Sequence, residues 1–273
     1  MITVKDVKIG KNCPLVLIAG PCVIESDKII FDTAEQLKKI TEKLKIPLIF
    51  KASFDKANRS AVEYYRGPGI VKGLQILAEI KKRFDIPVIT DIHCSEQIPQ
   101  VAEVVDIIQI PAYLCQQTDI VVNAAKTGKA LNIKKGQFIA PWDMDKIAKK
   151  AKSTGNDKIF ITERGTVFGY NNLVCDFRSI NVIQELGYPV FVDITHIVRM
   201  PGPPSADVTG KSGQPQFIPV LTRAAVAAGC DGLFLEVHPD PEKALCDAAS
   251  MLHMKNLEQL LDVSLKISNL VKK

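Results

Sequence analysis

The stretch LVLIAGPC, residues 15–22, is an apolar run that stops at a glycine, a proline and a cysteine. Further short runs rich in Ile, Val, Leu or Phe follow it along the chain, at 47–54, 87–93, 106–113, 130–136, 159–165, 189–196 and 232–239. Nearly continuous apolar runs are typical of parallel strands that are covered by helices. The sequence therefore predicts a series of buried parallel strands.

Segments with apolar residues at helical spacing separate these runs, at 27–44, 69–84, 118–128, 143–153, 176–187 and 219–229, and a last one covers 255–272. The first of them opens at Ser26 or Asp27, either of which is a suitable N-cap. This alternation over 273 residues favours an α/β fold, a (β/α)8 TIM barrel, over an open sheet. We expect residues 2–13 to form a β-hairpin over the N-terminal mouth of the barrel. Without a linker or low-complexity segment, residues 1–273 are expected to form a single domain.

Composition argues against several classes of protein. The net charge of +5 is spread along the chain, without a Lys/Arg block longer than three residues, which disfavours nucleic-acid binding. No apolar run reaches 18 residues and the N-terminus lacks the apolar stretch of a signal peptide, so we expect neither a membrane span nor export. The seven scattered cysteines contain no CxxC pair, which predicts free thiols and a cytoplasmic protein.

Each apolar run ends in polar side chains, and in a barrel these strand ends converge on one rim, where active sites lie. One group of rim residues is cationic and comprises Lys51, Lys56, Arg59, Lys134 and Arg164. Clustered cations repel one another unless an anion lies between them, so they indicate a ligand with several phosphate or carboxylate charges. The alternative is that they form salt bridges with Asp55, Asp91 and Glu163.

The cysteine of the opening stretch belongs to a second rim group, which comprises Cys22, His196, Glu236 and Asp247. Thiolate, imidazole and carboxylate ligands together suit a divalent ion such as zinc, iron or manganese. Spacing leaves two alternatives open, in which Cys22 is a packed core residue or a nucleophile with His196 as its base. Other candidate ligands are His93, Cys94, His238 and Cys246.

Longer motifs occur in order between residues 14 and 265: GPCVIES, FKASFDKANRS, YRGPG, DIIQIPAYLCQQTD, IKKGQF, TERGTVFGYNNLVCDFRS, DITH and CDGLFLEVHPDPEKALCDA. In these motifs the chain resembles the 3-deoxy-D-manno-octulosonate 8-phosphate synthase family. The segment KANRS separates that family from the related 3-deoxy-D-arabino-heptulosonate 7-phosphate synthases, which typically have KPRTS there. The cysteine in GPCVIES is typical of the metal-dependent branch, since the metal-independent branch has asparagine at that position.

The resemblance implies a reaction in which phosphoenolpyruvate condenses with D-arabinose 5-phosphate and water. The products are 3-deoxy-D-manno-octulosonate 8-phosphate, a lipopolysaccharide precursor, and inorganic phosphate. The implied phosphoenolpyruvate site holds the phosphate with Lys134 and Arg164 and the carboxylate near Lys56, and it is lined by Gln109, Pro111 and Ala112.

The resemblance also assigns the sugar, the metal and the catalytic residues. Arg59 and Ser60 are implied to bind the sugar phosphate, with Asn58 and Lys51 along the sugar. The implied ligands of a divalent metal ion are Cys22, His196, Glu236 and Asp247. The implied catalytic residues are Lys56, Asn58, Asp91, which approaches the reacting centre, and His196.

One position departs from the family pattern. Gln116 stands where the family usually has an arginine that reaches across a subunit boundary toward the sugar phosphate. This predicts weaker binding of arabinose 5-phosphate, within the homotetramer that the family forms.

The Pro- and Gly-rich segment 199–216 is long for a loop, and it is expected to be a mobile lid over the rim or, alternatively, a flexible connector. Two rival functions remain at this stage. One is a heptulosonate synthase that uses erythrose 4-phosphate, and the other is a sensor of phosphorylated ligands on an inactive barrel.

Overall fold

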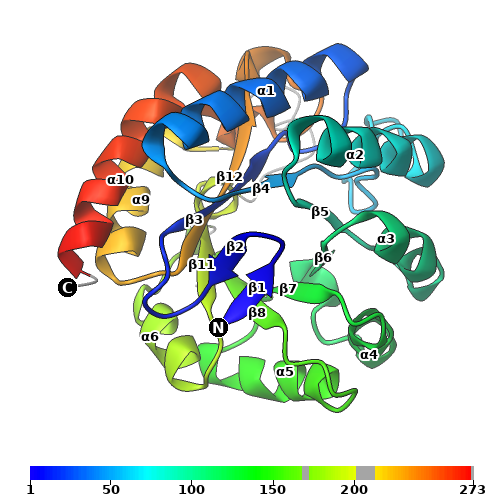
Figure 1. The fold of residues 1–273 in the computed structure, drawn as a ribbon, viewed down its shortest axis with the longest axis vertical. Coiled ribbons are helices and arrows are strands. Elements are labelled where there is room, and N and C mark those ends of the chain that lie inside the picture. Colours follow the sequence, from blue (N-terminus) through cyan, green and yellow to red (C-terminus); the bar gives the residue numbers. More distant parts are fainter. Residues whose placement is uncertain (168–171, 201–212, 272–273) are drawn as a thin grey trace.

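A computed structural model describes residues 1–167, 172–200 and 213–271 of the chain. Its centre is a closed ring of parallel strands in the order β3-β4-β5-β6-β7-β8-β11-β12, and β12 pairs again with β3 (Figure 1). This confirms the predicted (β/α)8 barrel. The strands are β3 (Val16–Gly20), β4 (Leu48–Lys51), β5 (Val88–Asp91), β6 (Ile107–Ile110), β7 (Ala130–Lys134), β8 (Ile159–Glu163), β11 (Val190–Asp193) and β12 (Gly232–His238).

Helices surround the ring and bury their apolar stripes against the outer faces of the strands (Figure 1). They are α1 (Asp27–Leu44), α2 (Ile70–Phe84), α3 (Ile98–Val104), α4 (Thr118–Lys126), α5 (Met144–Lys152), α6 (Arg178–Glu185), α9 (Ile218–Ala227) and α10 (Leu257–Val271). Helix α1 begins where the sequence predicted, because the Ser26 hydroxyl accepts a hydrogen bond from the Ile29 amide at 3.3 Å. Sequence analysis did not identify α3, whose two turns are too short to establish a helical period.

The interior of the barrel is a separate apolar core. It contains Ile18, Ile49, Ile89 and Ile107 together with the rings of Phe160, Phe191 and Phe234. The hairpin of β1 (Ile2–Val4) and β2 (Val7–Ile9) packs four apolar side chains onto this core and closes the end of the barrel at which the strands begin (Figure 1). The predicted N-terminal cap is therefore confirmed.

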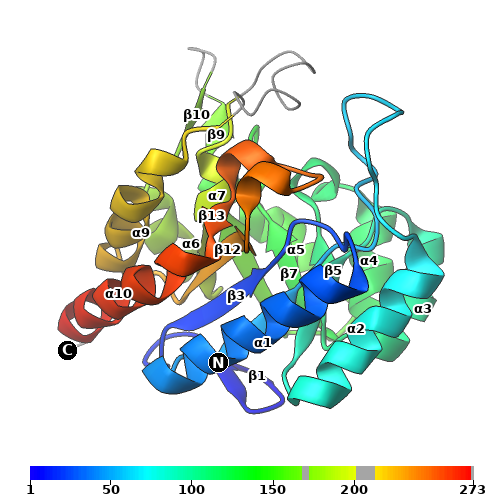
Figure 2. The same cartoon turned by 90° about the horizontal axis from the view of Figure 1, so that it is seen from above.

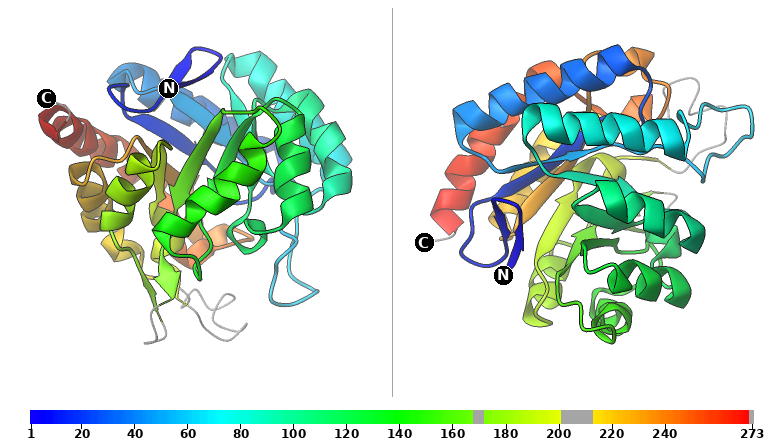
Figure 3. Two further views of the ribbon diagram at one scale, coloured as in Figure 1. Left: turned by 90° about the horizontal axis from the view of Figure 1, so that it is seen from below. Right: turned by 45° about the vertical axis from the view of Figure 1, so that its right-hand side comes forward.

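The opposite end of the barrel carries loops and short elements (Figure 2). They include β9 (Thr166–Val167), β10 (Leu173–Val174), α7 (Ile194–Ile197), β13 (Leu252–His253) and the 3₁₀ turns η5 (Pro241–Lys243) and η6 (Ala248–Ser250). The long loop 52–69 also projects at this end, away from the hairpin (Figure 3). Of the expected lid at 199–216, residues 201–212 lie outside the described ranges. In the part of the chain that the structure describes, no helix combines the length and hydropathy that crossing a membrane requires.

Candidate active site

The end of β3 approaches β4 so closely that only glycine fits there. A Cβ atom on Gly20 would lie 1.9 Å from the backbone oxygen of Lys51. The chain then turns at Pro21 and buries Cys22 completely, and the Cys22 carbonyl accepts a hydrogen bond from Lys51 Nζ at 3.0 Å. The GPC sequence therefore brings a thiol and an ammonium group together at the rim.

Glu236 near the end of β12 is the central anion of the rim. Its carboxylate lies 3.0 Å from Lys51 Nζ and 3.6 Å from Lys56 Nζ, and all three side chains are nearly inaccessible to solvent. Burial alone would raise the pKa of Glu236, but the charges of Lys51 and Lys56 outweigh burial and hold that pKa well below its ordinary value. Glu236 is therefore ionised and fixes the position of both lysines.

A second buried carboxylate, Asp193 at the end of β11, connects two of the predicted subsites. Its Oδ2 pairs with Lys134 Nζ and lies 2.7 Å from His196 Nδ1, while its Oδ1 accepts a hydrogen bond from the His196 amide at 3.0 Å. Burial lowers the pKa of Lys134, and the Asp193 charge offsets this only in part. Sequence analysis assigned no role to Asp193. The available signal was its position three residues before His196, where it is the N-cap of α7.

The four predicted metal ligands do not form one group of candidate ligand atoms, but divide between two groups of three that share Asp247. One group contains Cys22, Cys246 and Asp247, the other contains His196, Glu236 and Asp247, and within each group the candidate ligand atoms lie within 4.8 Å of one another. Asp247 is held by Arg199 at 2.9 Å and has a left-handed backbone, with φ of 50°. One group offers sulfur and the other offers a nitrogen, with carboxylate oxygens in both, and these are ligand types that zinc, iron or manganese accepts.

The competing ligands that the sequence left open mostly lie elsewhere. His238 accepts a hydrogen bond from the Asp240 amide on Nδ1 and faces Glu25 with Nε2, while His93 contacts Asp91. In the described ranges, neither these histidines nor Cys94 belongs to either group of candidate ligands, whereas Cys246 does.

The nucleophile alternative for Cys22 does not agree with its surroundings. Burial, a hydrogen bond with Cys246 and the charge of Asp247 together raise the pKa of the Cys22 thiol well above its ordinary value. A cysteine nucleophile requires the opposite shift, which a nearby cation or a base supplies. The surroundings of Cys22 therefore argue against the nucleophile alternative. The core alternative stays open, because Cys22 also packs with Val23, Cys246 and Met251 in a small buried cluster.

Asp91 at the end of β5 is buried and ionised. It accepts a hydrogen bond from Ser53 Oγ at 2.5 Å and lies 3.0 Å from His93 Nε2. Burial would raise the pKa of Asp91, but the His93 hydrogen bond and the charges of Lys51 and Lys56 lower it far below the ordinary range.

The cationic group continues at Arg164, after β8. The side chain is buried, and its Nη1 has no hydrogen-bond partner among the described residues; the same is true of Oε1 of Gln109 on β6. Burial lowers the pKa of Arg164 somewhat, against the charge of Asp193. An unsatisfied buried donor is costly, so this guanidinium points to an anionic ligand that completes its hydrogen bonds.

Two residues that sequence analysis did not assign hold the Arg164 turn in place. The Glu163 carboxylate accepts hydrogen bonds from the amides of Arg164 at 3.0 Å and Gly165 at 2.7 Å. Lys135, fully buried, lies 3.5 Å from the same carboxylate and donates to the carbonyls of Gly136 and Ile139. The sequence feature that could have identified this ion pair was the presence of opposite charges, Lys135 and Glu163, at the ends of the neighbouring strands β7 and β8.

The salt-bridge alternative for the cations is correct only in part. Lys51 and Lys56 pair with Glu236 and Lys134 pairs with Asp193, none of which was the expected partner. Of the expected partners, Asp55 binds Arg66, Glu163 binds Lys135, and Asp91 contacts His93.

The predicted sugar-phosphate residues lie on the loop 52–69. Asn58 and Ser60 are exposed, whereas the Arg59 side chain is largely buried, with Nη1 3.0 Å from Cys246 Sγ and 3.8 Å from Asp247. Gln116 is exposed, and its backbone carbonyl accepts a hydrogen bond from Lys150 Nζ at 2.8 Å. Pro111 is half-buried and Ala112 is buried at the end of β6, beside Gln109.

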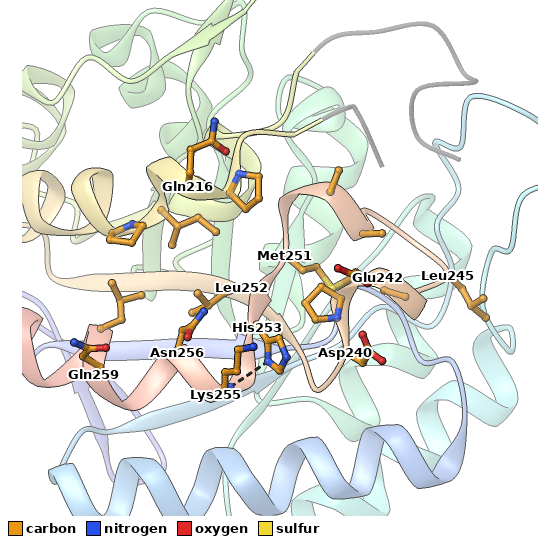
Figure 4. A pocket seen from close by; sticks show the side chains of 18 of the residues that line it. Gln216, Asp240, Glu242, Leu245, Met251, Leu252, His253, Lys255, Asn256 and Gln259 are labelled. Atoms are coloured by element: carbon orange, nitrogen blue, oxygen red, sulfur yellow. Dashed lines mark hydrogen bonds between the residues drawn. The ribbon is translucent and has the colours of Figure 1, made fainter. Parts of the chain in front are cut away.

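A cavity of about 1480 Å³ lies beside the rim, between the segment 240–256 and the helices α9 and α10 (Figure 4). Arg59 reaches it, but its lining includes neither Lys134 nor Arg164. The cavity therefore does not include the residues that are predicted to bind the phosphoenolpyruvate phosphate.

Comparison with known proteins identifies the family of the chain. The sequence profile described as the DAHP synthetase I family matches residues 1–273. A protein of Geotalea uraniireducens is 54% identical over 272 residues, covering 99% of this chain and 98% of the relative. A protein of Desulfosudis oleivorans is 54% identical over 261 residues (95% and 92%), and one of Geobacter sulfurreducens is 51% identical over 271 residues (99% and 98%). All three are named 2-dehydro-3-deoxyphosphooctonate aldolase. The chain belongs to the DAHP synthetase I family, and within it to the 2-dehydro-3-deoxyphosphooctonate aldolases, which are the 3-deoxy-D-manno-octulosonate 8-phosphate synthases that its motifs resemble.

Proposed function

We propose that this protein condenses phosphoenolpyruvate with D-arabinose 5-phosphate and water to give 3-deoxy-D-manno-octulosonate 8-phosphate and phosphate. The observation that carries the proposal is the buried Arg164 guanidinium, whose Nη1 lacks a partner in the described ranges, at the same rim as Lys134. Membership of the aldolase group supports it, because the name of those relatives, 2-dehydro-3-deoxyphosphooctonate aldolase, is another name of the synthase for this eight-carbon product.

The phosphoenolpyruvate phosphate binds between Lys134 and Arg164 in this proposal. Lys56 lies near the carboxylate, Gln109 offers its free side-chain oxygen, and the backbone at Pro111 and Ala112 lines the pocket. Arg supplies a planar pair of donors and Lys a compact charge, and together they match a phosphate dianion.

Arabinose 5-phosphate binds on the side of the loop 52–69. Arg59 and Ser60 hold its phosphate, and Asn58 and Lys51 lie along the sugar. Because Asn58 and Ser60 are exposed, we expect this loop to close over the sugar when it binds.

The proposed roles of the rim residues follow from the positive charge that develops on phosphoenolpyruvate during the reaction. Carbon 3 of phosphoenolpyruvate attacks the sugar aldehyde, positive charge develops at carbon 2, water adds there, and phosphate leaves by C–O cleavage. The ionised Asp91 carboxylate stabilises the positive charge, and the fixed lysines hold the reactants at attack distance, which supplies several kcal/mol.

Cys22, His196, Glu236 and Asp247 would hold a divalent ion, and Asp193 keeps His196 turned so that Nε2 faces Glu236 and Asp247. Such an ion polarises an oxygen of the substrate or lowers the pKa of a bound water. Following the resemblance, we further propose a single domain, a homotetramer that shares the sugar-phosphate site across subunits, and a place in the cytoplasm.

Product analysis tests the proposal. The purified protein is incubated with phosphoenolpyruvate and either arabinose 5-phosphate or erythrose 4-phosphate, and the products are identified by mass spectrometry. We expect the eight-carbon product, and no more than a trace of the seven-carbon product. A preference for erythrose 4-phosphate would contradict the proposed substrate, and full activity after exhaustive chelation would contradict the metal site.

A further inference from the structure

Cys246 is a second buried thiol beside the proposed metal site, and the resemblance gives it no role. Its Sγ lies 3.0 Å from the Sγ of Cys22, and the residue is 3% exposed. It belongs with Cys22 and Asp247 to one of the two groups of candidate ligand atoms. Cys22, by contrast, is grouped with Cys246 rather than with His196 and Glu236.

The surroundings of Cys246 are unlike those of a cysteine that only fills the core. Arg59 Nη1 lies 3.0 Å from its sulfur, and the Asp247 carboxylate follows it in the chain. A guanidinium at this distance compensates the charge of a thiolate, which is the form of cysteine that binds metals. Lys51, Lys56 and Arg199 add further positive charge around the group.

The separation of the two sulfurs is also compatible with one shared ion. Two thiolates bound to one zinc ion at about 2.3 Å each lie roughly 3.3–3.8 Å apart, the shorter distance applying in five-coordinate and the longer in tetrahedral geometry. The sulfurs of Cys22 and Cys246, now 3.0 Å apart, would therefore need to separate by less than about 1 Å.

We infer that Cys246 is an additional sulfur ligand of the ion that Cys22 binds, and that the pair makes this site select soft divalent ions such as zinc and cadmium over manganese. Two thiolates favour such ions because soft ligands prefer soft metals. The inference rests on the proposed metal site, and it adds a ligand to the four that the resemblance implies.

Cadmium titration of the metal-free protein tests the inference by absorbance rather than by activity. Each thiolate bound to cadmium adds ultraviolet charge-transfer absorbance, so the intensity per bound ion counts the sulfur ligands. Wild type is compared with Cys246→Ser, Cys22→Ser and, as a control thiol outside both ligand groups, Cys94→Ser. We expect Cys246→Ser and Cys22→Ser each to keep about half of the wild-type intensity, and Cys94→Ser to keep all of it.

Binding affinities give a second readout that does not depend on intensity. We expect Cys246→Ser to weaken cadmium and zinc binding by roughly 10- to 100-fold and manganese binding much less. Circular dichroism of the metal-free variants checks that they fold, and Cys246→Ala repeats the test without a hydroxyl. Equal intensity in wild type and Cys246→Ser, or complete loss of the band in Cys22→Ser, would overturn the inference and leave the four-ligand site intact. Absence of any cadmium–thiolate band in wild type would overturn the metal site itself.

Discussion

Replacing Asp193 by asparagine removes the carboxylate that joins the proposed metal site to the proposed phosphate site. The amide keeps one oxygen, which still accepts from the His196 amide and from Thr195 Oγ1. Its NH₂ group replaces Oδ2 and therefore presents a donor to Lys134 Nζ and to His196 Nδ1. His196 must then carry its proton on Nε2, the nitrogen that faces Glu236 and Asp247.

The expected magnitudes follow from these contacts. Loss of the partner that orients a metal-binding histidine costs about 10- to 100-fold in metal affinity, or about 1.4–2.8 kcal/mol. Removing one partner of a buried ion pair costs about 3–5 kcal/mol of folding stability. The pKa of Lys134 is already lowered by burial, so the lysine loses its proton more easily than usual, and we expect the lower end, about 3 kcal/mol.

The assays are zinc affinity by competition with a chelator and the free energy of unfolding of the metal-free protein in urea. Asp262→Asn is a matched control, because Asp262 pairs with Lys266 at the surface, where an ion pair contributes at most about 1 kcal/mol. If Asp193→Asn bound zinc within threefold of wild type and unfolded like Asp262→Asn, the linking role of Asp193 would be refuted.

Three further predictions concern the rim, the sugar site and the pH dependence of stability. Gly20→Ala places a Cβ atom 1.9 Å from the Lys51 carbonyl oxygen and should lower the free energy of unfolding in urea by at least about 3 kcal/mol. Gly155→Ala is the control, since its Cβ atom meets no atom within 4 Å and only the left-handed backbone should cost about 1–2 kcal/mol. Equal losses in the two variants would contradict the close approach of residue 20 to the Lys51 carbonyl. Gln116→Arg restores the positive charge that the family usually has at this position. It should lower the KM for arabinose 5-phosphate about tenfold and leave the KM for phosphoenolpyruvate unchanged. An unaltered KM for arabinose 5-phosphate would count against a sugar-phosphate site that crosses the subunit boundary. Burial, with the Asp145 carboxylate, raises the pKa of Tyr188 to about 12, so the neutral Tyr188 hydroxyl stabilises the folded state fully below about pH 10, and this stabilisation is lost as the pH rises through 12. The free energy of unfolding of wild type should therefore fall more steeply than that of Tyr188→Phe between these pH values. Parallel curves of unfolding free energy against pH would disprove the effect.

The barrel could be predicted from sequence because each strand is a nearly continuous apolar run and each run ends in polar residues. The same regularity placed Cys22, Lys134 and Glu236 at one rim before any contact was known. It did not reveal α3, whose two turns after a 3₁₀ turn carry too few apolar positions to define a period.

The pairing of charges at the rim was not predictable. Lys134 on β7 pairs with Asp193 on β11, and Lys51 on β4 pairs with Glu236 on β12. In each case the two strands are far apart in sequence and lie next but one in the ring, with one strand between them. Alternation along a strand gives only the direction of a side chain, not its partner. For the same reason sequence analysis gave Cys246 no greater weight than His238, although only Cys246 lies against Cys22.

The most direct test of the account is the position of the metal and of phosphoenolpyruvate in a crystal grown with zinc and that substrate. Anomalous diffraction should place one ion within bonding distance of Cys22 Sγ and His196 Nε2, with the substrate phosphate between Lys134 and Arg164. An ion bound without Cys22, or a phosphate held away from Arg164, would contradict the account.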